Sequence, residues 1–279
     1  MASDNTEGQK TWTDRACAWV ANDELFDHLF APVTAAVLAA ADIRDGESVL
    51  DVGCGSGTLL EAAVAKGASA TGVDISGPMV EAARIRVPTA SATEADAQTA
   101  DLLALPGALF DVVMSRFGVM FFADPITAFA NLRAAAPDGR LAFACWRSRD
   151  ENPMFSQGID LLNAELVAPP APTPPGEPGP TSLSDPDRLD DVLSRAGWRN
   201  VDLQPLDFVC DYGSLHGTDG VEERLSIILS TGGRDAREEL EPRLGPAGWQ
   251  SLLDRVRGTL RPASGSLTHP AAVWLVTAD

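Results

Sequence analysis

The sequence predicts an α/β protein with a doubly wound, mostly parallel sheet that carries helices on both faces. In the first half of the chain, short runs rich in β-branched residues alternate with helical stretches, and the first of these runs ends in a cluster of glycines. The expected strands are 48–53, 70–75, 110–115 and 139–146, and the expected helices between them are 58–66, 77–84 and 123–135. Such alternation is typical of parallel strands whose crossover helices cover the sheet on either side.

The segment before the first strand predicts a helical cap over residues 1–41. From residue 22 to residue 41, apolar side chains recur at three- and four-residue steps, which places them on one face of a helix. Pro32 is expected to divide this helix in two, because proline lacks the amide hydrogen that a helix interior needs. The core of the fold is then expected at residues 42–150.

Residues 151–279 predict the remainder of the core together with a large insertion. A loop at 168–180 holds seven prolines and two glycines, a composition typical of a linker or an ordered surface loop. The later elements are a helix through about Ala196, strands at 201–210 and 271–277, and helical stretches at 220–230 and 234–259. The helical insertion between the two strands covers about 211–268, and we predict that it forms a lid.

The composition limits the partners and the compartment. Forty acidic residues against 21 basic ones give the 279-residue chain a net charge of −19, which repels phosphate backbones and anionic lipid. No apolar run approaches the ~20 residues of a membrane-spanning helix, and the polar, acidic start lacks the pattern of a secretory signal. We therefore expect a cytoplasmic monomer or homodimer that binds neither nucleic acid nor membrane. Four scattered cysteines without a C-x-x-C pair predict reduced thiols.

The strongest signal for chemistry is the sequence Asp51-Val-Gly53-Cys-Gly55-Ser-Gly57, which follows the first strand. Glycines let the chain turn sharply and let the backbone approach a ligand, and the amides at the start of the next helix suit negatively charged groups. Asp74 ends the next strand and would lie beside the same cleft, where its carboxylate could accept both hydroxyls of a ribose. The pattern therefore predicts a nucleotide site.

The spacing of the glycines separates this motif from a dinucleotide site. A G-x-G-x-x-G fingerprint would place its third glycine at position 58, where this chain has Thr58. The observed G-x-G-x-G, preceded by the acidic Asp51, resembles motif I of the class I S-adenosylmethionine-dependent methyltransferases. The resemblance implies a Rossmann-like, seven-stranded fold, S-adenosylmethionine as the cofactor, S-adenosylhomocysteine as its product, and enzymatic methyl transfer.

Later segments are similar to further motifs of that family. Segment 72–79 resembles the second motif, in which an acidic residue holds the ribose and Met79 would pack on the adenine. Segments 95–97, 110–117 and 137–141 resemble the third motif, the fourth strand with its exit, and the turn before strand five. The cofactor-binding residues that the resemblance implies are Trp19, Asp51, Gly53, Cys54, Gly55, Gly57, Asp74, Ile75, Met79, Asp96, Ala97 and Ser115.

The acceptor is expected to be a small molecule. Methyltransferases that modify exocyclic amines of nucleic-acid bases or of glutamine typically carry Asn/Asp-Pro-Pro-Tyr/Phe after strand four, where this chain has Ser115-Arg-Phe-Gly118. We expect methylation of a nucleophilic C, N or O atom of a specialised metabolite. The aromatic turn with Phe117 and Phe121 favours an aromatic or indole-like acceptor, and a lipid or quinone-like acceptor is the nearest alternative. Asp124 has no partner carboxylate at ligand spacing, so no metal is predicted.

A base that takes a proton from the acceptor is useful to such chemistry but optional, because a sulfonium already activates the methyl group. The chain has only three histidines and one tyrosine, so few side chains qualify. The candidate catalytic bases are Glu24, His28, Tyr212 and His216. Each is expected where the lid meets the cleft, whereas His269 lies just before the last strand and is less well placed.

Two other function classes stay open at this point. A nicotinamide-dependent oxidoreductase is disfavoured by Thr58 and by the lack of a Tyr-x-x-x-Lys pair. A module that binds a nucleotide without catalysis is disfavoured by the intact glycine motif.

Overall fold

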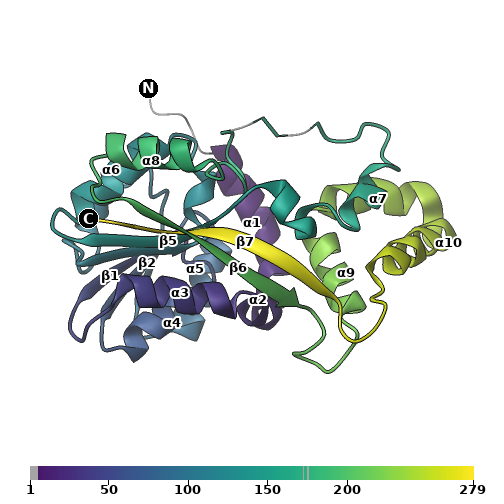
Figure 1. The fold of residues 1–279 in the computed structure, drawn as a ribbon, viewed down its shortest axis with the longest axis horizontal. Helices are drawn as coiled ribbons and strands as arrows, with labels where there is room; N and C mark the ends of the chain where they lie inside the picture. The colour runs from purple at the N-terminus through teal and green to yellow at the C-terminus, as the bar shows by residue number, and fades with distance from the viewer. Residues whose placement is uncertain (1–5, 172, 175) are drawn as a thin grey trace.

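A computed structural model describes residues 6–171, 173–174 and 176–279, and its centre is one mixed β-sheet (Figure 1). Within these residues the sheet has seven strands in the order β3-β2-β1-β4-β5-β7-β6. The strands are β1 (Ser48–Val52), β2 (Ser69–Asp74), β3 (Ser91–Glu94), β4 (Val112–Arg116), β5 (Arg140–Trp146), β6 (Asp202–Asp211) and β7 (Thr268–Ala278). The strands from β3 to β5 pair in parallel, whereas β7 pairs antiparallel with both β5 and β6. The predicted mostly parallel, Rossmann-like fold class is confirmed.

Helices cover both faces of the sheet (Figure 1). The α-helices are α1 (Thr6–Ala21), α2 (Asp23–Leu29), α3 (Ala31–Ala41), α4 (Thr58–Ala65), α5 (Gly77–Arg86), α6 (Pro125–Ala135), α7 (Ile159–Asn163), α8 (Pro186–Arg195), α9 (Val221–Ser230) and α10 (Arg234–Leu260). Short 3-10 helices are η1 (Leu102–Ala104), η2 (Val119–Phe121), η3 (Arg149–Glu151) and η4 (Pro153–Phe155). Because α3 lies on one side of β4 and β5 and α6 with α8 on the other, these two strands are buried at all but one end position each.

Helix α1 lies within the predicted helical cap but before residue 22, where the apolar periodicity begins. Trp12 and Trp19 both lie inside α1. Only Trp12, Ala16 and Trp19 mark an inner face at helical spacing, and polar residues surround them, so the periodic signal is weak. The expected break is present, because α2 and α3 meet at an angle of 67° and Pro32 lies in the first turn of α3.

The C-terminal half adds a helical lobe beside the carboxyl ends of the parallel strands, at the right of Figure 1. In this lobe α10 packs against both α7 and α9. A kink divides α10 at Gly245, whose φ of 67° is non-helical and which lies between Pro242 and Pro246. The proline-rich segment crosses from this lobe back to the core, where the Gly179 amide donates a 3.1 Å hydrogen bond to the Met120 carbonyl.

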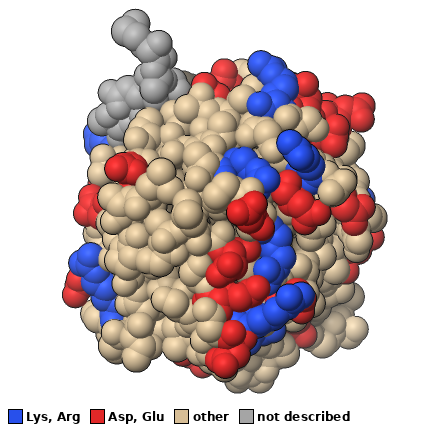
Figure 2. Space-filling view, turned by 90° about the vertical axis from the view of Figure 1, so that its left-hand side faces the viewer, with Lys and Arg blue, Asp and Glu red and all other residues tan. Residues whose placement is uncertain are grey.

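Acidic and basic side chains share one band of the surface. On the face in Figure 2, red and blue groups lie next to one another along this band, beside a broad area without charged side chains. Among the described helices, no single one is long and apolar enough to cross a membrane, although the bent pair α2 and α3 meets that criterion by length and composition.

Candidate ligand cavity

A cavity of about 810 Å³ opens at the carboxyl ends of the parallel strands. Its lining comes from the loops after β1, β2, β3 and β4, from α1 and α2, and from the C-terminal helical lobe. One side is therefore built by the core strands and the other by the segments that the sequence marked as cap and lid. Ligands of open α/β sheets bind at this end of the strands, where neighbouring loops diverge.

The glycine loop after β1 brings bare backbone to the cavity. Gly53 has a φ of +66°, and a Cβ there would lie 2.6 Å from the Cα of Gly118, so only glycine fits. The amides of Gly53 and Cys54 both donate to the Val73 carbonyl, at 2.8 and 3.0 Å, which ties the loop to β2. Gly55 has a φ of +53° and open space where its Cβ would be, so its backbone faces the cavity without a side chain.

Asp74, at the end of β2, fixes this loop from the opposite side. Its Oδ2 accepts a 2.9 Å hydrogen bond from the Gly55 amide, and its Oδ1 accepts one of 2.9 Å from the Ser76 amide. Burial raises the pKa of Asp74, and the backbone hydrogen bonds oppose that rise. Each carboxylate oxygen has a second lone pair, so Asp74 can accept further hydrogen bonds from a ligand in the cavity that it lines.

Asp51 is a buried carboxylate without a hydrogen-bond partner. It is 1% exposed, it lines the cavity, and neither of its oxygens accepts a hydrogen bond within the described part of the chain. Burial raises its pKa to about 8, while the charge of Arg116 favours the ionised form and that of Asp74 disfavours it. A buried carboxylate in this state is costly unless a donor or a positive charge reaches it. The site therefore calls for a cationic or hydrogen-bond-donating group of a ligand.

Most of the other predicted cofactor residues also line the cavity. They are Trp19, Cys54, Ile75, Met79, Asp96 and Ala97, which join Asp51, Gly53, Gly55 and Asp74. Met79 is buried in the first turn of α5, and Asp96 begins the loop after β3, where its Oδ1 accepts a 3.0 Å hydrogen bond from the Gln98 amide. The structure thus brings together ten of the twelve predicted positions.

The remaining two predicted positions, Gly57 and Ser115, lie outside the cavity lining. A Cβ at Gly57 would lie 3.3 Å from Ala83, so this glycine allows the close approach of α4 and α5. The Ser115 hydroxyl is buried, donates to the Val52 carbonyl at 2.7 Å and accepts from the Gly118 amide at 3.1 Å. Both residues hold the loops in place, and their assignment to the cofactor stays a prediction.

None of the four predicted bases lines the cavity among the described residues. Glu24 and His216 are exposed. His28 Nε2 forms a 2.9 Å hydrogen bond with the Ser214 hydroxyl, which joins α2 to the loop after β6. Tyr212 is fully buried, its hydroxyl lies 3.3 Å from His269 Nδ1, and burial raises its pKa. The expected meeting of these side chains with the cleft is therefore absent from the structure.

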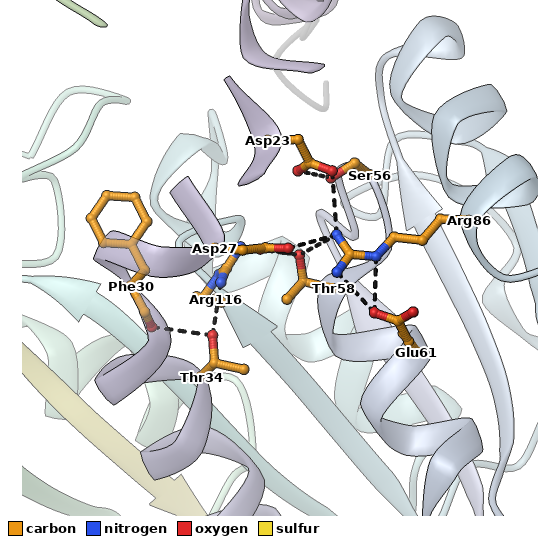
Figure 3. A network of polar contacts seen from close by, with 9 residues as sticks. All are labelled: Asp23, Asp27, Phe30, Thr34, Ser56, Thr58, Glu61, Arg86 and Arg116. Atoms are coloured by element: carbon orange, nitrogen blue, oxygen red, sulfur yellow. Dashed lines mark hydrogen bonds and ion pairs between the residues drawn. The ribbon is translucent and has the colours of Figure 1, made fainter. Parts of the chain in front are cut away.

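Two other polar residues of α2, Asp23 and Asp27, contact the residues around the glycine loop, and Figure 3 shows these contacts. Each lies one position before a predicted base, Glu24 or His28, in the sequence. Asp27 forms ion pairs with Arg86 at 2.7 Å and with Arg116 at 3.3 Å. Asp23 accepts a 2.5 Å hydrogen bond from the Ser56 hydroxyl and pairs with Arg86 at 3.3 Å. These contacts, which we call the α2 clamp, fasten the N-terminal cap to the glycine loop.

Aromatic side chains form a second part of the cavity wall. Phe117 stacks on Trp146 with ring centroids 4.5 Å apart, and Phe30 meets both rings edge-on at 5.2 and 5.7 Å. Phe155 lies edge-on to Trp146 at 5.3 Å. The predicted Phe121 also lines the cavity, and its ring centroid lies 4.8 Å from that of Trp12. We call Phe30, Phe117, Trp146 and Phe155 the aromatic chamber; a flat apolar group suits it.

Sequence reasoning missed most of the chamber and the clamp. Phe30 lies more than one hundred residues before Trp146 and Phe155 in the sequence, and no local pattern joins the three rings. The only available signal for the clamp was the pair Asp23 and Asp27, spaced by one helical turn on α2.

Comparisons with known proteins find similar methyltransferase sequences. Residues 50–143 match a family model described as a methyltransferase domain. The chain is 37% identical over 121 residues to nocamycin O-methyltransferase from Saccharothrix syringae, which covers 40% of this chain and 42% of that protein. It is 31% identical over 160 residues to a ubiquinone biosynthesis O-methyltransferase from Brucella anthropi, which covers 57% of this chain and 62% of that one. The matches thus span less than two thirds of either relative.

Solved structures share the fold at low identity. The YcgJ protein from Bacillus subtilis matches with a TM-score of 0.51 and 18% identity, covering 89% of this chain and 96% of that one. The [4+2]-cyclase SpnF matches with a TM-score of 0.52 and 16% identity, covering 89% and 80%. Because a cyclase is among the matches, the fold alone does not specify the reaction.

Proposed function

We propose that the chain is a class I S-adenosylmethionine-dependent methyltransferase, which transfers a methyl group from this donor to a small molecule bound in the same cavity. The observation that carries the proposal is the unpartnered carboxylate of Asp51 beside the glycine loop and Asp74. These groups are what a ligand with an ammonium group and a ribose requires. The methyltransferase match favours this function over nicotinamide-dependent oxidation.

The residues present fit the donor. Asp51 would pair with the ammonium of the methionine part, which compensates its buried charge. Asp74 would accept the ribose hydroxyls, and the resemblance to the family assigns Met79, Asp96 and Ala97 to the adenine. The donor supplies a methyl group on a positively charged sulfur, which makes the group ready for transfer to a nucleophile.

The protein's contribution is to hold the acceptor and to exclude water. The aromatic chamber provides flat apolar surfaces next to the donor side of the cavity. The α2 clamp keeps α2, which carries Phe26 and is followed by Phe30, against the glycine loop. Holding two reactants in a productive geometry supplies much of the rate enhancement in such transfers.

We propose a flat, largely apolar specialised metabolite as the acceptor. The aromatic chamber supports an aromatic group, and similarity to proteins named as O-methyltransferases supports oxygen as the methylated atom. The match to the ubiquinone biosynthesis relative supports a quinone-like ring as the second candidate. The small-molecule class itself is supported by the size of the whole cavity, about 810 Å³.

The test is titration calorimetry of the purified protein with S-adenosylhomocysteine, with NAD as the control. We expect S-adenosylhomocysteine to bind and NAD not to bind. Binding of NAD alone, or of neither compound, would overturn the proposal. Transfer of labelled methyl groups to a panel of aromatic acceptors should then be lost in Trp146→Ala, while this variant keeps its affinity for S-adenosylhomocysteine.

A further inference from the structure

Arg224 is a buried arginine that faces the cavity from the C-terminal lobe. It lies on α9, it is 1% exposed, and it belongs to the cavity lining. Its Nη2 donates to the carbonyls of Met154 and Gln157, the second at 3.2 Å. Its Nε has no hydrogen-bond partner in the described part of the chain. The guanidinium is therefore fixed in direction while part of its donor capacity is unused.

No negative charge compensates this guanidinium. None of the ion pairs among the described residues includes Arg224, and no carboxylate contributes to the electrostatics around it. Its polar neighbours are neutral near pH 7, because burial raises the pKa of Tyr212, raises that of Cys210 to about 12 and lowers that of His269 to about 4. A buried cation without a counter-ion costs several kcal/mol in a folded protein.

Two partly buried arginines near the glycine loop are paired, which sets Arg224 apart. Arg116, with 11% of its side chain exposed, pairs with Asp27, and Arg86 pairs with Asp27, Asp23 and Glu61. The protein thus supplies carboxylates to its buried guanidinium groups on the glycine-loop side of the cavity. On the chamber side it supplies none, so the missing anion is expected from a ligand.

We propose that Arg224 binds an anionic oxygen group of the acceptor, a carboxylate or an equally ionised enolate, and so selects acceptors that carry a negative charge. The inference rests on the proposed function and specifies the acceptor of that same cavity. The neighbouring Phe155 and Trp146 would hold the apolar part of such a molecule, because Phe155 is in the short η4 helix that also carries Met154. Arginine suits this role, since its planar fork matches the two oxygens of a carboxylate.

The lack of a His, Tyr or Lys side chain in the described cavity lining agrees with a charged acceptor. No His, Tyr or Lys side chain is among the described residues that line the cavity. A group that is already ionised when it binds does not need a proton removed by the protein. The arrangement therefore accounts for the separation of the four predicted bases from the cavity.

The test compares two probes of nearly the same shape, naphthoate and naphthamide, which differ in charge. Their affinities are measured by calorimetry with wild-type protein that is saturated with S-adenosylhomocysteine. We expect naphthoate to bind about tenfold tighter or better, the ratio typical of a hydrogen bond to a charged group. Equal affinities, a preference for the amide, or no binding of naphthoate would each overturn the proposal.

Variants assign the preference to the residue. Arg224→Met should reduce the ratio to within about twofold, whereas Arg224→Lys should keep a preference because it keeps the charge. The matched control is Arg255→Met, which removes an exposed arginine of the same helical lobe outside the cavity lining and should leave the ratio unchanged. If Arg224→Met does not fold, the wild-type ratio together with Arg224→Lys decides the result.

The donor gives the last control. If Arg224→Met loses as much affinity for S-adenosylhomocysteine as for naphthoate, the guanidinium binds the donor's own carboxylate, and the proposal is overturned. If wild-type protein binds S-adenosylhomocysteine but shows no preference for naphthoate, only this inference fails. If it does not bind S-adenosylhomocysteine, the proposed function fails.

Discussion

The two halves of the cavity differ in how the chain builds them. The glycine-loop half comes from segments close together in sequence, in which Asp51 lies near the end of β1, Asp74 ends β2 and Asp96 follows β3. The chamber half joins α1, α2, the ends of β4 and β5, η4, α7 and α9, whose lining residues run from Gly8 to Gly232. The first half is therefore local strand-loop-helix geometry, and the second exists only after distant elements have packed.

The halves also differ in the charge that they leave without a partner. The glycine-loop half has the unpartnered carboxylate of Asp51, and the chamber half has the incompletely bonded guanidinium of Arg224. Each half thus requires a ligand group of opposite charge, a cationic one beside Asp51 and an anionic one beside Arg224. The difference shows how one cavity can separate the binding of two ligands.

The largest effect is expected from Asp51→Asn, which tests the glycine-loop half. The variant should bind S-adenosylhomocysteine more weakly by about 2–5 kcal/mol, the range for removing one partner of a buried charge pair. Calorimetry measures this loss, with Glu94→Gln, an exposed residue outside the cavity lining, as the control. Unchanged affinity in Asp51→Asn would remove this residue from the donor site.

The raised pKa of Asp51 predicts that the stability of the ligand-free protein depends on pH. The folded-state pKa of Asp51 is raised from 3.8 to about 8. Below about pH 4, Asp51 is protonated in both the folded and the unfolded state. Between about pH 4 and 8, only the unfolded state releases the proton. The free energy of unfolding therefore falls as pH rises through this interval. Thermal unfolding should therefore show Asp51→Asn gaining stability over the wild type as pH rises toward 8. In the wild type, S-adenosylhomocysteine affinity should rise over the same interval.

Asp74→Ala is the next largest perturbation of the glycine-loop half. We expect donor affinity to fall by about 1.5–3 kcal/mol, as for hydrogen bonds to a charged group. The Gly55 and Ser76 amides also lose their acceptor, so hydrogen exchange at the glycine loop should become faster. Wild-type affinity in this variant would contradict the assignment of Asp74 to the ribose.

The α2 clamp joins the two halves, and Asp27→Asn tests that connection. The substitution removes the ion pairs to Arg86 and Arg116, and the expected loss is about 1–3 kcal/mol of unfolding free energy because Arg116 is nearly buried. Glu61→Gln is the matched control, since Glu61 pairs with the same Arg86 but is 55% exposed, and it should cost less than about 1 kcal/mol. Equal losses in chemical denaturation would show that the clamp has no special role.

The smallest effects are expected at Glu24 and His216. Both are exposed and outside the cavity lining, so Glu24→Gln and His216→Gln should keep kcat and donor affinity within about twofold of the wild type. A large fall in kcat with unchanged donor affinity in either variant would show that the residue acts as a base. This result would count against an acceptor that binds already ionised.

The helix α2 shows why part of the site could not be predicted. Apolar periodicity identified the helix, but the polar residues chosen on it, Glu24 and His28, point away from the cavity, whereas Asp23 and Asp27 reach the glycine loop. One residue along a helix turns the side chain by about 100°. Only the packing of α2 on α4 and α5 decides which polar face meets the site.

The sequence by itself determined the parallel core and the glycine-loop half of the cavity. A strand, a glycine turn and an acidic residue at the end of the next strand have short-range geometry that fixes where Gly53 and Asp74 lie. The tertiary structure alone decided the aromatic chamber, the α2 clamp and the burial of Arg224 without a counter-ion. These features depend on contacts between residues far apart in the chain, and a local pattern carries no record of which distant side chains will meet.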